Sequence, residues 1–346
     1  MMRTASQRSG DAGFVLPSVL AYIAVAMLIL LVGAQALERA RDASLALQSD
    51  RVLVNALDDL EAEVTYRYLV SAPVRYGVSM TQGPRDAMGL ILGTPVEQSV
   101  NETAPQGADA LWRADGGMIG FQRDTVRATI EYRDVAGLLS LNSGDPDLIA
   151  GLLQEFGVEK SKATGLAARL KDYTDEDTLR RPLGAERADY RMRQLPPPTN
   201  SPLRNLSEVT RVMGWEELDF VSDPDFLSNV TASLTGPVPK WAFSPASVLA
   251  MRDEASQAMV TNSDPLSIAS ANTVVPGARA RFIIRASDTN TGRTRLRIVE
   301  IERKVAAAAA PWTRSLVFDR PLPETTRPVS LEGVETVGFL QDRTDE

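Results

Sequence analysis

The side chains of this chain that could do chemistry are mostly carboxylates. They gather in one dense cluster and two smaller pairs, which are Asp172, Asp175, Glu176 and Asp177, then Asp145 with Asp147, and Asp223 with Asp225. Oxygen ligands at such spacing can hold calcium, although the EF-hand pattern with its central Gly and terminal Glu is absent. The commoner explanation of such a cluster is helix capping and a solvated turn. If a metal is bound, Asp172, Asp175 and Asp177 are the calcium candidates.

Two residue types are missing, and this limits the chemistry further. The chain has no histidine and no cysteine. The commonest general base and the usual transition-metal ligands are therefore absent, and Ser-His-Asp or Cys-His hydrolysis is excluded. Carboxylate pairs can catalyse acid–base reactions, but the sequence indicates no aromatic-lined cleft that would raise their pKa. We predict no catalytic residue and expect a protein that is not an enzyme.

The charge argues against a nucleic acid as the main partner. The net charge is −8, whereas affinity for DNA depends on cations that displace counterions from the phosphates. The segments at Gly157-Val158 and 212–214 resemble helix-hairpin-helix or SAM-like modules, some of which bind DNA. Arg180 and Arg181 are the only adjacent basic pair nearby, too few for such a footprint. A protein-contact module is therefore the favoured interpretation.

The N-terminal region contains a long apolar segment. No charged residue stands between Phe14 and Glu38, and this length is about enough to cross a bilayer core of roughly 30 Å as a helix. Three interpretations compete: an uncleaved signal anchor, a secretory signal cleaved near residues 34–36, and a short leader that is cut before the apolar segment.

The residues around the start of the segment favour the third interpretation. The leader 1–13 carries Arg3 and Arg8, as expected for a cytoplasmic side, and ends at Gly13 before the aromatic Phe14. This resembles a class III prepilin leader, which implies peptidase cleavage between Gly13 and Phe14 and N-methylation of Phe14. The helical pattern also continues unbroken to about residue 70, with apolar residues at 53, 57, 60 and 64 on one face.

Beyond the helix, strand patterns enclose a helical region. Residues 126–132 alternate as in a half-buried strand, and 280–286 with 294–301 form a hairpin pattern around 288–292. Short strands are expected at 111–113 and 120–122. Helices are expected at 147–156, 161–173, 207–214 and 245–254. We therefore expect an α+β fold with a long N-terminal helix packed on an antiparallel sheet, and a helical domain inserted between the strands.

This order of elements resembles the type IV pilin and pseudopilin fold. Six motifs narrow the resemblance: residues 134–142 (DVAGLLSLN), 170–177 (LKDYTDED), Gly184-Ala185-Glu186 with Tyr190, 200–203 (NSPL), 206–209 (LSEV) with 212–214, and 241–249 (WAFSPASVL). With these motifs the chain resembles minor pseudopilin K of type II secretion systems, the general secretion pathway protein K family. In the last of these the Asn-Thr pair of the family is missing, which leaves the detail of that loop open. The resemblance covers roughly residues 13–305.

The resemblance implies a division of the chain into six parts. These are a leader at 1–13, a transmembrane and assembly helix at 14–72, the first part of the pseudopilin sheet at 73–142, an inserted helical domain at 143–235, the second part of the sheet at 236–305, and a C-terminal tail at 306–346. From Pro321 onward we expect the tail to be poorly ordered, except near Leu331 to Leu340, because it is polar and rich in proline.

The resemblance also implies a function. The protein would be a non-catalytic minor pseudopilin at the tip of the pseudopilus, helping to start its assembly and protein secretion across the outer membrane. It would span the inner membrane of a Gram-negative bacterium once, with the globular part in the periplasm. Its expected partners are the I, J and H types of minor pseudopilin, the major pseudopilin, the prepilin peptidase, the assembly platform and inner-membrane lipid. No nucleic acid is expected.

Ser18 would be the fifth residue of the mature chain. Pseudopilins resemble one another in carrying a glutamate here, which can pair with the N-terminal amine of the next subunit. An unpaired carboxylate in lipid is costly, so a neutral residue fits a subunit with nothing assembled above it. Ser18 is thus the candidate tip-specifying residue, and an ordinary polar residue in a signal anchor is the alternative.

Other functions stay open at this point. A minor pilin of a type IV pilus or competence system has the same leader and fold. A periplasmic, membrane-anchored nucleic-acid-binding protein would use the helical hairpins, and a membrane-anchored periplasmic enzyme would need a constellation that the sequence does not indicate.

Overall fold

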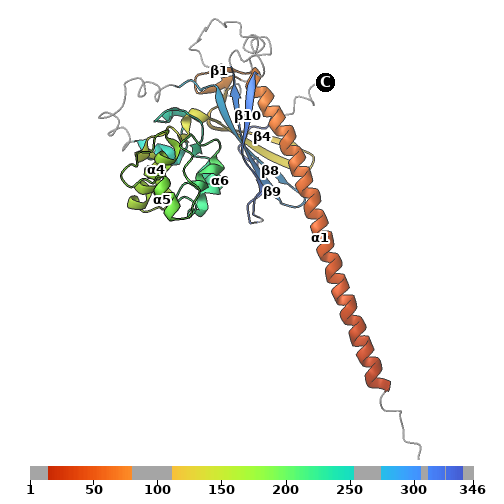
Figure 1. Ribbon diagram of the computed structural model, residues 1–346. Helices are drawn as coiled ribbons and strands as arrows, with labels where there is room; N and C mark the ends of the chain where they lie inside the picture. Colours follow the sequence, from red (N-terminus) through yellow and green to blue (C-terminus); the bar gives the residue numbers. More distant parts are fainter. Residues whose placement is uncertain (1–14, 80–110, 253–273, 305–310, 324, 338–346) are drawn as a thin grey trace, which may run out of the picture. The chain divides into compact units, whose positions relative to one another are not determined.

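The computed structural model describes residues 15–79, 111–252, 274–304, 311–323 and 325–337 (Figure 1). The predicted cleavage site at Gly13 and Phe14 lies outside these residues. The chain divides into two compact units, Met1–Val52 and Leu53–Glu346.

Helix α1 (Val15–Val70) is the longest element. Its N-terminal part, which includes the backbone of Ser18, carries exposed apolar side chains such as Tyr22 and Leu30. Val19–Val70 contains an 18-residue window of mean hydropathy 2.4, none of it buried, so by length and composition this helix could cross a membrane. A helix of this length was expected, because neither Gly nor Pro occurs between Gly33 and Pro73.

The second half of α1 packs against the sheet of its own unit. The buried residues on this face are Leu53, Leu57, Leu60, Val64 and Tyr68, each at most 2% exposed. They belong to one hydrophobic cluster with aromatic side chains of the sheet, among them Trp112, Tyr132 and Phe282. The predicted spacing of four and three residues is confirmed as the buried face of this part of the helix.

The main sheet has five antiparallel strands in the order β10-β9-β8-β5-β4. The strands are β4 (Asp115–Arg123), β5 (Val126–Asp134), β8 (Arg279–Asp288), β9 (Thr294–Arg303) and β10 (Trp312–Pro321). The predicted strand at 126–132 and the predicted hairpin of β8 and β9 are confirmed. The strand expected at 120–122 begins five residues earlier, at Asp115. A β-bulge between Asp115 and Gly117, where Gly116 has a φ of 109°, allows the strand pairing to continue to this point.

A smaller antiparallel sheet contains β1 (Ala72–Val74), β2 (Gly77–Ser79) and β3 (Leu111–Arg113) in that order. The strand expected at 111–113 is therefore confirmed. The chain ends α1 at Val70 and enters β1 two residues later, across Ser71, whose side-chain hydroxyl donates a hydrogen bond to the Arg67 carbonyl at 2.6 Å.

The sequence assigned residues 306–346 to a tail beyond the sheet, and this assignment is corrected here, because part of that region is a strand of the sheet. Strand β10 pairs with β9 from Trp312 opposite Arg303 to Pro321 opposite Arg295. Further on, the Gly120 amide donates to the Glu335 carbonyl at 2.7 Å, and the Val337 amide donates to the Gly120 carbonyl at 2.9 Å. Proline and charged residues suit edge strands, so a polar, proline-containing composition did not exclude a strand here.

The helical insertion begins and ends at one place. Strand β6 (Leu139–Ser140) and strand β7 (Val230–Thr231) run parallel and side by side. Between them lie α3 (Pro146–Glu155), α4 (Lys160–Thr174), α5 (Arg187–Met192), the 3-10 helices η4 (Leu206–Arg211) and η5 (Asp219–Ser222), and α6 (Pro224–Leu227). The helix expected at 207–214 is the 3-10 helix η4, and the one expected at 245–254 is α7 (Ala246–Leu249), whose last predicted residues lie outside the described part.

The insertion packs around a second hydrophobic cluster, which is distinct from the one under α1 and also includes Leu296 and Ile298 of β9. α3 and α4 form its centre, with Leu152, Leu166 and Leu170 almost fully buried. The fold expected from the sequence, α+β with an N-terminal helix on an antiparallel sheet and a helical domain between the strands, is therefore confirmed.

Candidate functional site

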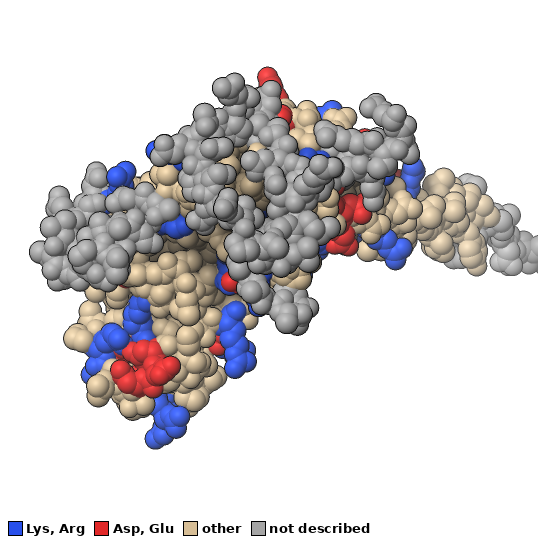
Figure 2. Space-filling view, turned by 90° about the horizontal axis from the view of Figure 1, so that it is seen from above, with Lys and Arg blue, Asp and Glu red and all other residues tan. Residues whose placement is uncertain are grey.

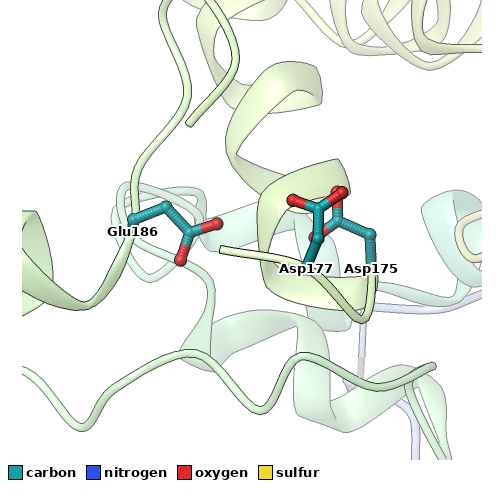
Figure 3. A group of neighbouring side chains, drawn as sticks. All are labelled: Asp175, Asp177 and Glu186. Carbon is teal, nitrogen blue, oxygen red and sulfur yellow. The ribbon is translucent and has the colours of Figure 1, made fainter. Parts of the chain in front are cut away.

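Three carboxylates meet where α4 ends and α5 begins (Figure 3). Asp175 caps the C-terminus of α4, Asp177 follows it, and Glu186 stands at the N-cap of α5. One oxygen from each of the three lies within 4.8 Å of the others. Figure 3 shows Glu186 pointing toward the two aspartates from the opposite side. Of the sequence candidates, the structure brings Asp175 and Asp177 together and adds Glu186.

Asp172 lies outside this group of three. It is fully buried in the last turn of α4. Its carboxylate accepts hydrogen bonds from Arg181 Nη1 at 3.0 Å and from the Arg181 amide at 3.2 Å. Gly184 approaches it so closely that a Cβ there would overlap the carboxylate. Asp172 thus holds the loop between α4 and α5 in place, which is why glycine stands at 184.

Glu186 is the feature of the group that needs explanation. It is 8% exposed. Its carboxylate faces the backbone amides in the first turn of α5, with which it forms a capping box, but neither of its oxygens, nor Asp175 Oδ1, takes part in a well-formed hydrogen bond. Burial raises the pKa of Glu186, and the negative charges of Asp172 and Asp175 add to this effect. Buried polar atoms without partners cost free energy. A cation between the carboxylates would remove that cost.

The donor set of the group fits calcium. Calcium takes oxygen ligands, preferably carboxylates, and three carboxylate side chains converge here. Part of the local charge is already balanced, because Arg181 Nη1 also pairs with Asp175. Sequence spacing alone did not indicate Glu186, because it joins the group only through the closing of the loop 178–185.

The other motif residues hold the insertion together. Asn142 donates to the carbonyls of Leu203 at 3.0 Å and Ala232 at 2.6 Å, and its Oδ1 accepts from the Leu203 amide at 2.8 Å. The Lys171 ammonium donates to the Asn142 carbonyl at 2.9 Å, and burial lowers the pKa of Lys171 to about 8. These contacts connect the start of the insertion with its middle and its end.

Two buried aromatic residues also connect separate segments of the insertion by hydrogen bonds to the backbone. The Tyr190 hydroxyl accepts a hydrogen bond from the Met213 amide at 2.9 Å, and Trp215 Nε1 donates to the Leu166 carbonyl at 3.0 Å. Both side chains are fully buried. Tyr190 therefore has a structural role in its motif, whereas Glu186 of the same motif belongs to the carboxylate cluster.

The helical hairpin of α3 and α4 does not present free amides to a phosphate. Gly157, with φ of 84°, turns the chain between the helices. The Glu159 carboxylate accepts hydrogen bonds from the amides of Ser161 at 3.0 Å and Lys162 at 3.1 Å. Hydrogen bonds to Ser161 and Lys162 lower the pKa of Glu159. The positions where a helix N-terminus binds an anion are thus taken by a carboxylate of the chain itself.

These observations define a class of protein: an α+β protein whose long N-terminal helix is apolar enough to cross a membrane, with a helical unit inserted between the strands of its sheet and a cluster of three carboxylates on that unit. Residues 137–220 match the family model described as type II secretion system (T2SS), protein K. The matched residues include the motifs at 170–177, 184–190, 200–203 and 206–214. The match confirms, on the helical insertion, the resemblance to the minor pseudopilin K family.

Comparison with solved structures gives a similar chain in the crystal structure of the GspK-GspI-GspJ complex from the enterotoxigenic Escherichia coli type 2 secretion system. The sequence identity is 15% and the TM-score 0.43, with 79% of this chain and 99% of that chain covered. No curated protein matches the chain.

Proposed function

We propose that this protein is the minor pseudopilin at the tip of a type II secretion pseudopilus, where it helps to start assembly and thereby supports secretion across the outer membrane. The observation that carries the proposal is the family match on residues 137–220. That segment forms most of the helical insertion, which distinguishes this chain from a pilin that consists only of a helix and a sheet.

The membrane arrangement follows from α1. Its apolar part from Val19 would cross the inner membrane once, after cleavage between Gly13 and Phe14 and N-methylation of Phe14. The sheet and the insertion would lie in the periplasm, since Arg3 and Arg8 favour a cytoplasmic leader. The partners would be the I, J and H types of minor pseudopilin, the major pseudopilin and the assembly platform.

The tip position is supported by two features of the chain. Ser18 is neutral, so the subunit brings no buried carboxylate that would need an amine from a subunit above it. The insertion adds a helical unit to the sheet, and such breadth would hinder the stacking of identical copies.

The test uses the full chain in its own cells, with secreted proteins in the medium as the measurement. Deletion of the gene is expected to abolish secretion. Ser18→Glu is expected to lower secretion, because it places an unpaired carboxylate in the helix, while Ser18→Ala retains a neutral residue and is expected to leave secretion unchanged. Normal secretion by the Ser18→Glu variant would remove the support that Ser18 gives to the tip position.

We also propose that calcium binds the group of Asp175, Asp177 and Glu186. The burial of Glu186 beside two aspartates, without a well-formed hydrogen bond to either of its oxygens, supports this assignment. In the protein, the ion would connect the end of α4 to the start of α5 and so stiffen the insertion. It would have a structural role, because calcium in such a site neutralises and joins carboxylates.

A further inference from the structure

The two edge strands of the main sheet, β10 and β4, differ in composition. Strand β10 contains three charged residues, ends at Pro321 and shifts its register between Leu316 and Phe318. Charge, proline and irregular register all disfavour pairing with a strand of another chain. Strand β4 has none of these features over Gly117–Gln122, whose sequence is GMIGFQ. The edge at β4 therefore needs another form of protection.

The lack of charge in this part of β4 is a property that favours pairing between chains. On the lobe formed by the insertion, by contrast, basic side chains surround an acidic group (Figure 2). Segments that pair edge to edge between chains have low charge, high β-propensity and no proline. Gly117–Gln122 has neither charge nor proline and includes Ile119 and Phe121. An open β4 edge would thus be a site of self-association.

The hydrogen bonds of Gly120 show which backbone groups lie on the outer edge of β4. The Gly120 amide donates to the Glu335 carbonyl at 2.7 Å, and the Gly120 carbonyl accepts from the Val337 amide at 2.9 Å. Alternate residues of a strand direct their backbone groups to the same edge, so Met118 and Gln122 direct theirs outward as well. Among the described residues, nothing pairs with the outward groups of these two.

Residues 329–337, which we call the C-terminal cap, cover the β4 edge at Gly120. At one end of the cap, Val329 is 7% exposed, and its amide donates to Ser287 Oγ of β8 at 2.8 Å. At the other end, Val337 packs against the hydrophobic cluster under α1. The cap is therefore anchored on both sides of its contact with β4.

Gly120 is the residue that allows the cap to approach the strand. A Cβ at this position would lie 2.9 Å from Leu331 Cδ2 and 3.3 Å from Thr336 Cγ2, closer than ordinary van der Waals contact. Thr336 also forms a parallel bridge with Gly120. Glycine weakens a strand, and its presence inside one often marks the close approach of another backbone. The contact with the cap accounts for glycine at 120.

We propose that the C-terminal cap prevents this protein from pairing with a second copy of itself through β4. Without the cap, two β4 strands would pair antiparallel about a two-fold axis at Gly120, with Met118 opposite Gln122. Arg123 would lie opposite Gly117, so no like charges would face each other. A second copy is the occupant that this edge specifies, because the two edges then match in length and in their lack of charge. The cap would act in this way whatever the function of the protein.

Truncation of the chain after Arg327 removes the cap, and truncation after Val337 is the matched control, because it leaves the cap in place. Both variants retain α1 and are purified in detergent, and light scattering after size exclusion gives the protein mass at several concentrations. We expect the first variant to reach twice the wild-type mass and the second to equal the wild type. Gly120→Lys, added to the truncation after Arg327, should restore the wild-type mass, because the two lysines would face each other across the two-fold axis.

The variant Gly120→Val tests the same contact in a chain of full length. Its side chain would occupy the space of Leu331 and Thr336, so we expect release of the cap and twice the wild-type mass. Leu331→Ala, added to Gly120→Val, makes room for the valine and should lower the share of the dimer.

Near-ultraviolet circular dichroism checks that each variant is folded, and Gly120→Val decides if only the truncated chain loses its signal. A wild-type mass for either folded variant would overturn the proposal. A doubled mass that persists after Gly120→Lys would overturn it too, because β4 would then not be the contact. Loss of the fold in both variants would show that the cap belongs to the core and is not a cover, which is equally incompatible with the proposal.

Discussion

At the scale of single residues, Glu186 and Asp172 show how two neighbouring carboxylates take different roles. Asp172 accepts hydrogen bonds from Arg181, whereas the buried oxygens of Glu186 lie beside the first amides of α5 without a well-formed hydrogen bond. Both belong to motifs that the sequence already indicated. The different surroundings of Asp172 and Glu186 result from the conformation of the loop between them, which the spacing of residues in the sequence does not predict.

Calcium is expected to raise the melting temperature of the full chain in detergent, and chelation to lower it. A single site at about 100 times its dissociation constant contributes about 2.7 kcal/mol. Glu186→Gln should abolish most of the shift. Glu176→Gln is the matched control, because Glu176 is exposed and outside the group. Equal shifts in the wild type and Glu186→Gln would exclude Glu186 as a ligand.

Glu159 gives a prediction about pH. Its pKa is lowered in the folded protein by hydrogen bonds to Ser161 and Lys162, so its contribution to stability is present above the ordinary glutamate pKa and is lost as the pH falls through the lowered value. Glu159→Gln should therefore melt at a lower temperature than the wild type near neutral pH, with the gap closing in acid. Thermal unfolding at several pH values measures this. A gap that is constant with pH would contradict the capping role.

At the scale of elements, a buried ion pair connects the sheet to the insertion. Arg281 on β8 is fully buried, pairs with Glu300 on β9 and donates to the Leu227 carbonyl of α6. Glu300 also accepts hydrogen bonds from Thr231 at 3.0 Å and Ser233 at 3.3 Å. The pair thereby joins two strands of the sheet to the end of the insertion.

Removal of one partner is expected to cost more than removal of both. Arg281→Leu leaves Glu300 buried without its cation and should destabilise the protein by about 3–5 kcal/mol. The double variant Arg281→Leu with Glu300→Leu should recover part of this loss. Denaturant unfolding of the full chain followed by near-ultraviolet circular dichroism measures both. A double variant that is less stable than Arg281→Leu would contradict this prediction, because the loss would then not come from leaving Glu300 buried without a cation.

The elements that the sequence predicted well are those in which apolar residues recur at the regular spacing of a helix or a strand. The buried face of α1 from Leu53, the alternation in β5 and the hairpin of β8 and β9 needed no tertiary information. Strand β10 was missed because an edge strand tolerates proline and charge, so its pattern is weak. The Glu186 contact was missed because eight residues, including a turn with positive φ at Leu183, separate it from Asp177.

At the scale of the whole molecule, the processing of the N-terminus decides how the chain is used. We expect the mature protein, purified from its own membranes, to begin at Phe14 with a methylated amine, because the Gly13-Phe14 junction resembles a prepilin site. Intact-mass measurement tests this. A chain that begins at Met1 indicates a plain anchor, and one that begins at Leu37 indicates a secretory signal; either result contradicts the leader assignment.

The pairing of β5 with β8 has a consequence for how such a chain could have arisen. These strands are neighbours in the sheet, with Asp134 opposite Ala280, although more than a hundred residues separate them in the sequence. The insertion leaves at β6 and returns beside it at β7. The sheet therefore has the hydrogen-bonded layout of a plain hairpin at this point. A single insertion of the helical unit into the loop between β5 and β8 would therefore account for this topology, because no strand would need to change its neighbour.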